Sequence, residues 1–409
     1  MDKVKRLREK YPQFVYSNYS YNFSKNNLDI VFNFKIKPDL KFKTKITIKN
    51  VKQKRGLDNL IFHLGLIEML NYWKATCSPE IAIEAGYLNS DGIKFLKKVI
   101  FKGMGQYFYE NKINYLQNDF LKIKNDCKKK LSVNIQKNNK RRVLIPVGGG
   151  KDTPVTIELM RDDRNTLNGF ILNPRKSQLN IARIGKLKNL IIVSRELDPK
   201  LLRLNKKIGL NGHVPFSAFL SCLSLIIATL TNSGRVAFSW EKSSNEPNIK
   251  YLGKWVNHQW SKSIEFEKLF NSYSKKHLAK NIEIFSPTRN FSESEIVKIF
   301  SKLEKYHQVF LSCNNAYKIG KKNNKWCGKC PKCLSVYMYL YPFLGKEKLK
   351  KIFKKDLFED RKLIPLMKQL IGKEKFKPFE CVGTIKENRK IFEMLKKQNK
   401  DKNNILLKI

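Results

Sequence analysis

Two hydrophobic periods occupy the first third of the chain. Between Phe14 and Ile48, apolar residues alternate with polar and lysine residues on both sides of a turn at Pro38-Asp39. This alternation predicts a hairpin with one buried face and one lysine-rich, solvated face. Helical apolar spacing occupies Leu60 to Lys74 and returns from about Asp91 to Tyr109. Residues 1–138 are therefore expected to form an α+β N-terminal domain.

From Arg141 onward, short apolar runs alternate with segments of helical character. The apolar runs predict strands at Val143–Val147, Asn168–Leu172, Leu190–Val193, Val236–Trp240 and Ile282–Phe285. Helices are predicted to begin near Pro154, Lys176, Val214 and Ser292. This order is typical of a parallel sheet covered by helices on both faces. We therefore predict an α/β domain over residues 139–345, a basic linker at Lys128 to Arg142, and a lysine-rich helical segment over residues 346–409.

A glycine-rich loop follows the first predicted strand of this α/β domain. It consists of Gly148, Gly149, Gly150, Lys151, Asp152 and Thr153. Glycines leave backbone N–H groups accessible and a helix N-terminus adds positive potential, so the loop suits a phosphate. The carboxyl edge of a parallel sheet is also where such folds bind ligands. Lys151 and Thr153 are expected to add side-chain contacts, and Asp152 either holds Mg²⁺ through water or caps the helix.

The chain is strongly basic, because 82 lysines and arginines against 35 acidic residues give a net charge of +47. The lysines are spread over every segment, so the charge suits phosphate-rich small substrates and argues little for a nucleic-acid partner. Met1 to Lys10 is charged and no apolar core follows, which predicts a cytoplasmic protein. Val214 to Leu230 lacks charge but is short for a membrane span and carries four hydroxyl side chains, so we expect a buried helix.

Four of the eight cysteines are clustered. Cys327, Cys330 and Cys333 form C-x-x-C-x-x-C, and Cys313 lies upstream. Two-residue gaps let successive thiolates face one ion, and a fourth thiolate completes a structural tetrahedral zinc site with no open position. An iron–sulfur cluster and a redox C-x-x-C pair are the alternatives. The scattered cysteines are expected to be free thiols: Cys77, Cys127, Cys222 and Cys381.

Several polar residues are candidates for catalysis or substrate binding. His213 and His258 can act as acid or base near neutral pH, although isolated histidines are more often structural. Glu246 can bind metal or act as a base, or it is a solvated loop carboxylate. The phrase around His258 adds four candidate substrate contacts: Asn257, Gln259, Ser261 and Lys262. The arginines that either meet anionic groups or lie on the solvated surface are Arg161, Arg164 and Arg175.

The glycine loop resembles the S-G-G-x-D-[ST] pyrophosphate loop of the N-type ATP pyrophosphatases, with Gly148 in place of the first serine and Thr153 in place of the last. With the cysteine cluster and Ser286-Pro287-Thr288, it makes residues from about Arg141 to Leu340 resemble 7-cyano-7-deazaguanine synthase. This resemblance implies an adenine nucleotide alpha hydrolase-like fold that splits ATP into AMP and pyrophosphate. It does not account for the N-terminal domain.

A second resemblance spans both main domains. Besides the glycine loop, the phrases that carry it are Phe62-His63-Leu64-Gly65-Leu66, Asn71-Tyr72-Trp73-Lys74, Asn211-Gly212-His213-Val214-Pro215, Ser244-Asn245-Glu246 and Val256-Asn257-His258-Gln259-Trp260-Ser261-Lys262-Ser263. Together they look like the ATP-dependent UDP-N-acetylmuramoyl-L-alanyl-L-glutamate epimerases. The resemblance implies an enzyme of peptidoglycan precursor synthesis that binds a UDP-linked muramoyl dipeptide and inverts its terminal L-glutamate, using ATP and magnesium.

Two other functions stay open at this point. One is a 7-cyano-7-deazaguanine synthase-like or tRNA-modifying ATP pyrophosphatase, which the basic charge and the cysteine cluster favour. The other is a non-enzymatic zinc protein that binds nucleic acid, which would show salt-sensitive binding and no AMP release. The intact glycine loop argues against the non-enzymatic protein.

Overall fold

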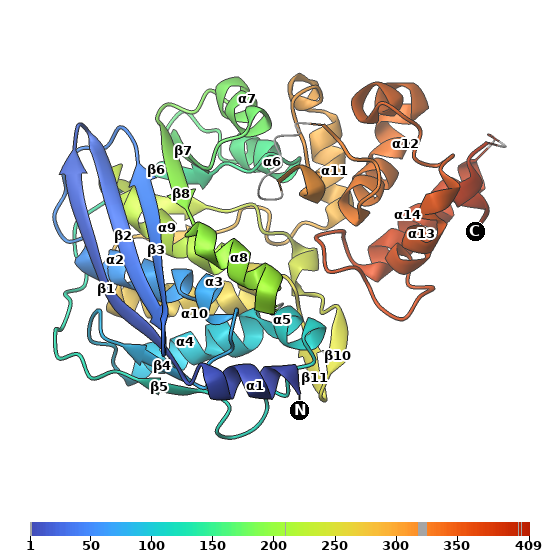
Figure 1. Cartoon of the computed structure of the whole chain (residues 1–409). Coiled ribbons are helices and arrows are strands. Elements are labelled where there is room, and N and C mark those ends of the chain that lie inside the picture. Colours follow the sequence, from blue (N-terminus) through green and yellow to red (C-terminus); the bar gives the residue numbers. More distant parts are fainter. Residues whose placement is uncertain (1, 209, 318–324, 400, 402) are drawn as a thin grey trace.

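The computed structural model describes residues 2–208, 210–317, 325–399, 401 and 403–409 (Figure 1). Its strands are β1 (Gln13–Ser24), β2 (Asn27–Ile36), β3 (Leu40–Ile48), β4 (Glu80–Ile83), β5 (Lys122–Lys124), β6 (Asn139–Pro146), β7 (Thr166–Leu172), β8 (Leu190–Glu196), β9 (Ser233–Ala237), β10 (Ile249–Tyr251), β11 (Lys254–Val256) and β12 (Glu283–Phe285).

Its helices are α1 (Lys3–Lys10), α2 (Asp58–Glu68), α3 (Leu70–Trp73), α4 (Ser90–Gly103), α5 (Gly105–Glu110), α6 (Asp152–Leu159), α7 (Lys176–Ile184), α8 (Pro199–Ile208), α9 (Phe216–Leu230), α10 (Ile264–His277), α11 (Glu293–Ser301), α12 (Pro331–Phe353), α13 (Ile364–Leu370) and α14 (Ile385–Gln398). Short 3-10 turns occupy Lys242–Asn245, Trp260–Lys262, Glu304–Tyr306, Asn314–Tyr317, Arg361–Leu363 and Ile405–Lys408.

Within the described residues, one ten-stranded sheet has the order β12-β9-β6-β7-β8-β3-β2-β1-β4-β5. The strands from β12 to β8 are parallel, as their alternation with helices predicts. The N-terminal strands β1, β2 and β3 form an antiparallel meander, which extends the predicted hairpin by one strand. Strand β3 pairs antiparallel with β8, opposing Ile46 to Arg195, so the sheet passes without a break from residues 1–138 into residues 139–345. The assignment of residues 1–138 and 139–345 to separate domains stays a prediction.

The two faces of the sheet are buried against different layers. Val143 and Ile145 of β6 lie in one hydrophobic core and Leu144 lies in the other, as the period of a strand requires. Helix α9 packs with α2 and β6 on the Leu144 face, whereas α6, α11 and α12 pack together in the core of the Val143 face. In Figure 1 the C-terminal helices α12, α13 and α14 lie on the side of the molecule away from β1, β2 and β3.

The predicted burial of Val214 to Leu230 is confirmed. Helix α9 is buried at every position from Ser217 to Leu230 except Leu220. Ser221 Oγ, Ser224 Oγ and Thr229 Oγ1 donate to the carbonyl oxygens one turn earlier at 2.9, 2.7 and 2.9 Å, so these buried hydroxyls are satisfied within the helix. Among the helices of the described residues, none combines the length and apolarity that a membrane crossing requires.

Three sequence predictions about elements are wrong in detail. The predicted strand Val236–Trp240 ends at Ala237, because Ser286 Oγ binds the backbone N–H and C=O of Trp240 at 2.9 and 2.7 Å. The predicted helix Asp91–Tyr109 is divided at Met104 into α4 and α5. Part of the predicted linker is structured: Asn134 is buried and accepts the N–H of Lys280 on its carbonyl oxygen, and β6 begins at Asn139.

Candidate active site

The glycine loop connects β6 to α6, where the sequence predicts it. It is held from the side by the segment that precedes the cysteine cluster: Leu311 N donates to Gly149 O at 2.6 Å, and Lys151 N donates to Ser312 Oγ at 3.3 Å. Gly148 N donates to Thr153 Oγ1 at 3.1 Å, so the threonine hydroxyl shapes the loop. The loop is thus a fixed element of the fold.

Gly149 occupies the tightest position of the loop. A Cβ atom there would lie 1.5 Å from Tyr317 Oη and 2.7 Å from Ser177 Oγ. Those two oxygens are hydrogen-bonded to each other at 2.6 Å. A side chain at Gly149 therefore cannot be accommodated without breaking the contact between α7 and the segment after Cys313.

Lys151 and Asp152 form the centre of a buried charge cluster. Lys151 is fully buried, and its Nζ lies 2.5 Å from Asp152 Oδ1 and 2.9 Å from Glu293 Oε1. Burial disfavours the charge of Lys151, but the neighbouring acids outweigh it and raise its pKa above the usual value. Asp152 is also disfavoured by burial, yet Lys151, Lys332 and Lys262 hold the pKa of its carboxyl below the usual value. Asp152 is therefore ionised at neutral pH.

The capping alternative for Asp152 is wrong. Helix α6 has Lys151 at its N-cap and makes no side-chain cap hydrogen bond. The Asp152 carboxylate instead accepts a hydrogen bond from Lys151 Nζ, and the Asp152 side chain is 27% exposed. A partly accessible, ionised carboxylate beside the glycine loop is the type of ligand that Mg²⁺ prefers.

Glu241 is a member of this cluster that the sequence analysis missed. It is 6% exposed, accepts a hydrogen bond from Ser243 Oγ, and has no partner for Oε2 among the described residues. Burial, with the nearby charge of Glu293, raises the pKa of Glu241 to about 8. At neutral pH this carboxyl is mainly protonated, so its O–H can donate to an acceptor.

Lys262, predicted as a substrate contact, lies in the same cluster. Its Nζ donates to Cys381 Sγ at 3.1 Å. Burial disfavours its charge, but contact with Cys381 and the negative charge of Asp152 raise the pKa of Lys262 above its usual value. Lys332 of α12 also contacts Cys381, because its Nζ donates to the backbone carbonyl oxygen of that residue. The cluster thus combines cations from three separate segments.

His213 and His258, which are 45 residues apart in sequence, lie side by side. Their ring centroids are 4.4 Å apart and their planes are inclined by 53°. Burial, followed by the charges of Lys262 and Lys74, lowers the pKa of His213 to about 3. Burial, then His213 and Lys262, also lowers the pKa of His258 well below its usual value. Both rings are therefore neutral at pH 7.

The hydrogen bonds of the two histidines determine which ring nitrogens can accept a proton. His258 Nδ1 lies 2.5 Å from Gln106 Oε1. An amide oxygen only accepts, so the assigned amide orientation puts the proton on Nδ1 and leaves a lone pair on Nε2 of His258. Within the described residues, His213 Nε2 is buried and has no hydrogen-bond partner. The charge of Lys262 acts on both rings and on the carboxyl of Asp152, so Lys262 lies within electrostatic range of the histidine pair and of the glycine loop.

The remaining predicted residues occupy different surroundings. Glu246 binds Lys377 Nζ at 2.9 Å and accepts the N–H of Ile385 at the start of α14, which places it in an ion pair at a helix N-terminus. Asn257 bridges Ser244 O and Gln259 N at 2.8 and 2.7 Å and so shapes the turn before the 3-10 segment. The side chains of Gln259 and Ser261 are buried.

The three predicted arginines are divided between surface and site. Arg161 and Arg164 pair locally, with Glu158 at 2.9 Å and Asp162 at 2.8 Å. Arg175 lies near Tyr317, whose hydroxyl abuts the glycine loop. Of the three, Arg175 is the one that lies beside the candidate site.

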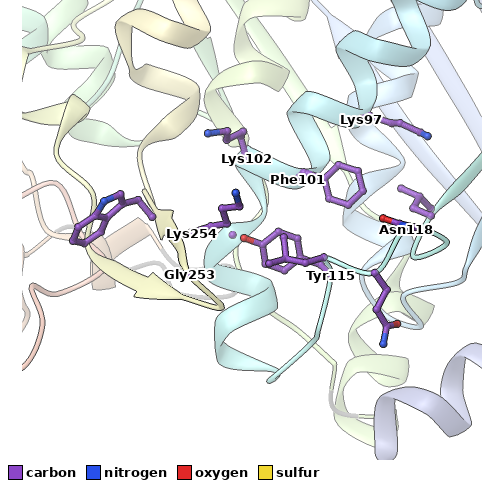
Figure 2. A pocket seen from close by; sticks show the side chains of 12 residues that line it. Lys97, Phe101, Lys102, Tyr115, Asn118, Gly253 and Lys254 are labelled. Carbon is purple, nitrogen blue, oxygen red and sulfur yellow. The ribbon is translucent and has the colours of Figure 1, made fainter.

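A cavity of about 590 Å³ is lined by residues of α4, the start of α5 and the β10–β11 hairpin (Figure 2). Gly105 lines it, and the next residue, Gln106, binds His258. Trp255 of β11 also lines it and is 65% exposed. The walls combine aromatic rings with ammonium groups: Phe101, Tyr115, Trp255, Lys97, Lys102 and Lys254. No acidic side chain is among the described lining residues.

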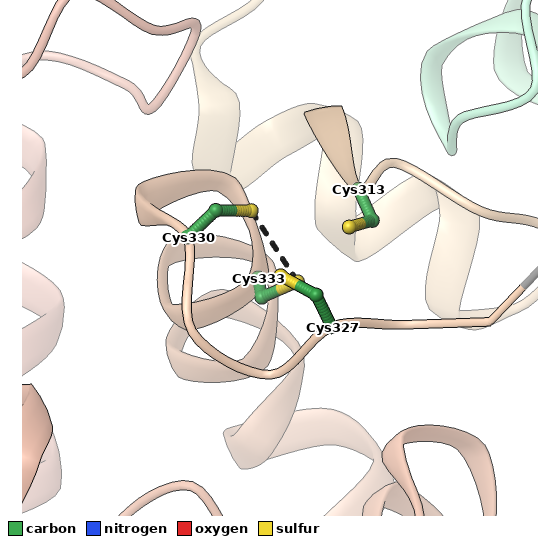
Figure 3. Close-up of side chains that lie close together, drawn as sticks. All are labelled: Cys313, Cys327, Cys330 and Cys333. Atoms are coloured by element: carbon green, nitrogen blue, oxygen red, sulfur yellow. Dashed lines mark hydrogen bonds between the residues drawn. The ribbon is translucent and has the colours of Figure 1, made fainter. Parts of the chain in front are cut away.

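The four predicted metal ligands converge (Figure 3). The Sγ atoms of Cys313, Cys327, Cys330 and Cys333 all lie within 4.8 Å of one another. Cys333 Sγ is 3.7 Å from Cys327 Sγ and 3.5 Å from Cys330 Sγ. A tetrahedral zinc site with Zn–S bonds of about 2.3 Å holds its sulfurs about 3.8 Å apart, so the set fits one such ion. A cluster of several irons would hold them farther apart, because irons and sulfides lie between the thiolates.

Signals for the missed residues were present but ambiguous. Glu241 follows the end of a predicted strand, at the edge where ligands bind. Glu293 lies in the first turn of the helix predicted to begin near Ser292, where acidic residues are common without any functional role. Lys332 lies inside the C-x-x-C-x-x-C motif, and Cys381 had no neighbouring motif at all.

Comparison with known proteins covers nearly the whole chain. Residues 5–287 match the family model of the MurL N-terminal domain, and residues 309–409 match that of the MurL C-terminal domain. Similar proteins include a UDP-N-acetyl-alpha-D-muramoyl-L-alanyl-L-glutamate epimerase of Salinispora tropica, 31% identical over 82% of this chain and 73% of that protein. A protein of the same name from Xanthomonas oryzae pv. oryzae is 32% identical over 81% of this chain and 73% of its own length.

Proposed function

The chain belongs to the MurL family, and from this premise we propose that it inverts the terminal glutamate of UDP-N-acetylmuramoyl-L-Ala-L-Glu to the D-configuration. The comparisons favour this epimerase over a deazaguanine synthase-like or tRNA-modifying enzyme. The observation that supports the mechanism is that the charge of Lys262 acts both on the histidine pair and on Asp152 of the glycine loop. A loop suited to a nucleotide and a pair of neutral imidazoles in one site fit a reaction that activates a carboxylate and then moves a proton.

ATP is the cosubstrate that such an epimerisation needs. The α-hydrogen of the peptide-bound glutamate lies beside a carboxylate, and its removal would put a second negative charge on that group. If a carboxylate oxygen attacks the α-phosphorus of ATP, pyrophosphate leaves and an acyl-adenylate forms. Its neutral carbonyl can accept the enolate electrons. Water then cleaves the anhydride and releases AMP, so the inversion is driven forward.

The cluster around the loop is suited to this activation. Backbone N–H groups at Gly149 and Gly150, the N-terminus of α6 and the ammonium group of Lys262 would provide positive potential for phosphates. Asp152 would hold Mg²⁺, which would shield the negative charge of the bound phosphates. The four cysteines would hold a zinc ion with no catalytic part, since all four coordination positions are filled by protein.

The histidine pair is suited to general base catalysis. Both rings are neutral at pH 7, and the lone pair on His258 Nε2 is available to take a proton from the α-carbon of the adenylated substrate. When the C–H bond breaks, its electrons move to the acyl oxygen, where the ammonium group of Lys262 stabilises the charge. A proton delivered to the other face of the carbon completes the inversion.

Turnover in D₂O tests this function. With ATP, Mg²⁺ and UDP-N-acetylmuramoyl-L-Ala-L-Glu, we expect AMP, pyrophosphate and an L-Ala-D-Glu product with deuterium at the glutamate α-carbon. His258→Asn is expected to slow deuterium incorporation by about 10² or more, because it removes the base. His277→Asn, which changes a histidine bound to Asp91 away from the cluster, is the control. Release of ADP, or a product without deuterium, would contradict the proposal.

A further inference from the structure

Inversion at one carbon requires proton transfer on both of its faces, and the histidine pair can serve only one. A carbon held between two rings would need about 7 Å between them, since nonbonded carbons pack at about 3.5 Å. The ring centroids of His213 and His258 are 4.4 Å apart. The two histidines therefore act from one side as a unit, and a second group must face the carbon from the other side.

We propose that Cys381 is this second catalytic residue, with Lys262 as its positioning partner. The proposal rests on the epimerase function given above. Cys381 Sγ is 3.1 Å from Lys262 Nζ, and the residue is only half-buried. Its backbone carbonyl is bound by Lys332 Nζ, which fixes the loop between α13 and α14 at the cluster. One cation thus contacts the thiol, and a second cation from a separate segment fixes the backbone of the same residue.

An independent feature shows that this part of the cluster is built for a ligand. Glu241 is 6% exposed and, within the described part of the chain, its Oε2 has no hydrogen-bond partner. It lies within electrostatic range of Lys262, the partner of Cys381, and of Lys151. Leaving a buried polar atom unpaired costs free energy unless another molecule satisfies it. The acyl and phosphate oxygens of an adenylated substrate are acceptors for the O–H that a protonated Glu241 offers.

The proton balance of the step is complete with these groups. A neutral imidazole of the pair takes the α-proton and becomes imidazolium, while the C–H electrons form the enolate. The Cys381 thiol then gives its proton to the opposite face, so that a C–H bond forms and a thiolate remains. The ammonium of Lys262, 3.1 Å away, stabilises that thiolate. Proton transfer from imidazolium to thiolate through solvent restores the starting state.

The test separates inversion from activation. Cys381→Ala is expected to lower epimerisation by about 10² or more, and to keep isotope exchange between pyrophosphate and ATP within about 2-fold. In D₂O the recovered L-Ala-L-Glu substrate should still gain α-deuterium, because the histidine side remains intact. Cys127→Ala, a half-buried cysteine outside the cluster, is the matched control. Epimerisation near the wild-type rate, or equal loss of pyrophosphate exchange, would overturn the assignment; failure of the wild-type protein to form AMP would instead refute the proposed function.

A second proposal concerns the cavity of Figure 2, whose described lining residues do not include His213, His258 or Cys381. We propose that it binds the nucleoside diphosphate end of the substrate. Trp255, which is 65% exposed, presents a ring on which a nucleobase can stack, and Lys102 and Lys254 present cations for the two phosphates. Figure 2 shows Lys102, Lys254 and Tyr115 around the same opening. This proposal also depends on the epimerase function.

The position of the cavity suits a long substrate. Gly105 lines the cavity while its neighbour Gln106 binds His258, and β11 leads from Trp255 to His258 within three residues. A substrate with its diphosphate in the cavity can therefore direct its peptide toward the histidine pair. The cavity volume of about 590 Å³ lies in the range of small-molecule sites.

A comparison of two substrates tests the cavity. Trp255→Ala is expected to raise KM for the UDP-linked substrate about 10-fold by loss of one stacking contact. It should leave KM unchanged for N-acetylmuramoyl-L-Ala-L-Glu, which lacks the nucleotide. Phe343→Ala, an exposed aromatic on α12 with 43% exposure, is the control. Equal effects on both substrates would overturn the cavity assignment, whereas absence of turnover of either substrate by the wild-type protein would refute the proposed function.

Discussion

Replacing Cys333 with serine is expected to abolish metal binding and unfold the C-terminal part of the chain. Cys333 Sγ lies 3.5 and 3.7 Å from two of the other cysteine sulfurs and is fully buried, so its loss opens the coordination sphere inside the core. Structural zinc sites contribute about 10–16 kcal/mol in apparent terms at pH 7, which is comparable to the stability of a whole domain. We expect one zinc per wild-type chain by elemental analysis and none in the variant.

The same variant is expected to lose ATP cleavage. Cys313 directly follows Ser312, whose hydroxyl accepts the N–H of Lys151, and Leu311 binds Gly149 O. Release of the metal therefore frees the segment that shapes the glycine loop. Cys127→Ser, outside the cluster, controls for the chemical change and should keep both metal and activity. A wild-type protein with no metal, or a Cys333→Ser protein with normal metal content, would contradict the assignment.

Replacing Asp152 with asparagine is expected to lower AMP formation by at least about 10²-fold, the effect typical of removing one preorganised electrostatic group from an active site. The substitution keeps the shape of the side chain but removes the charge that faces Lys151, Lys262 and Lys332. Lys151 keeps its ion pair with Glu293 at 2.9 Å, so the loop should remain folded. The rate of AMP release and the thermal midpoint, measured on the same samples, separate these effects.

Asp162→Asn is the matched control for Asp152. Asp162 lies just beyond α6, and its carboxylate pairs with Arg164 at 2.8 Å on the surface. It should change AMP formation by less than about 2-fold, because surface ion pairs are worth little. An Asp152→Asn protein with near-normal AMP release would remove this carboxylate from the proposed magnesium site. Equal losses of activity and thermal stability would indicate a structural part for it instead.

The features that sequence alone determined are local. The run from Val143 to Pro154 encodes strand, glycine loop and helix within twelve residues, and the spacing of Cys327, Cys330 and Cys333 places three thiolates around one point. Each depends on backbone geometry over a few residues, and the structure confirms the element order and the convergence of the four sulfurs. The alternation from Phe14 to Ile48 likewise identified strands and their buried face.

Tertiary structure decided which of these elements meet. Alternation shows which face of β3 is buried but not which strand it pairs with, so the junction of β3 with β8 and the single continuous sheet could not be predicted. The same limit applies to the site. Glu241, Glu293, Lys332 and Cys381 come from four separate segments, and an isolated charge or thiol in a sequence gives no sign of its neighbours.

The histidine pair shows the physical reason most directly. His213 and His258 looked like two isolated candidates, yet packing puts their rings 4.4 Å apart, and burial makes both neutral. Desolvation and the field of Lys262 depend on what surrounds a side chain in three dimensions. Residue type and local spacing therefore determined which groups were available for chemistry, while packing over long sequence separations decided their charge, their partners and the side from which they act.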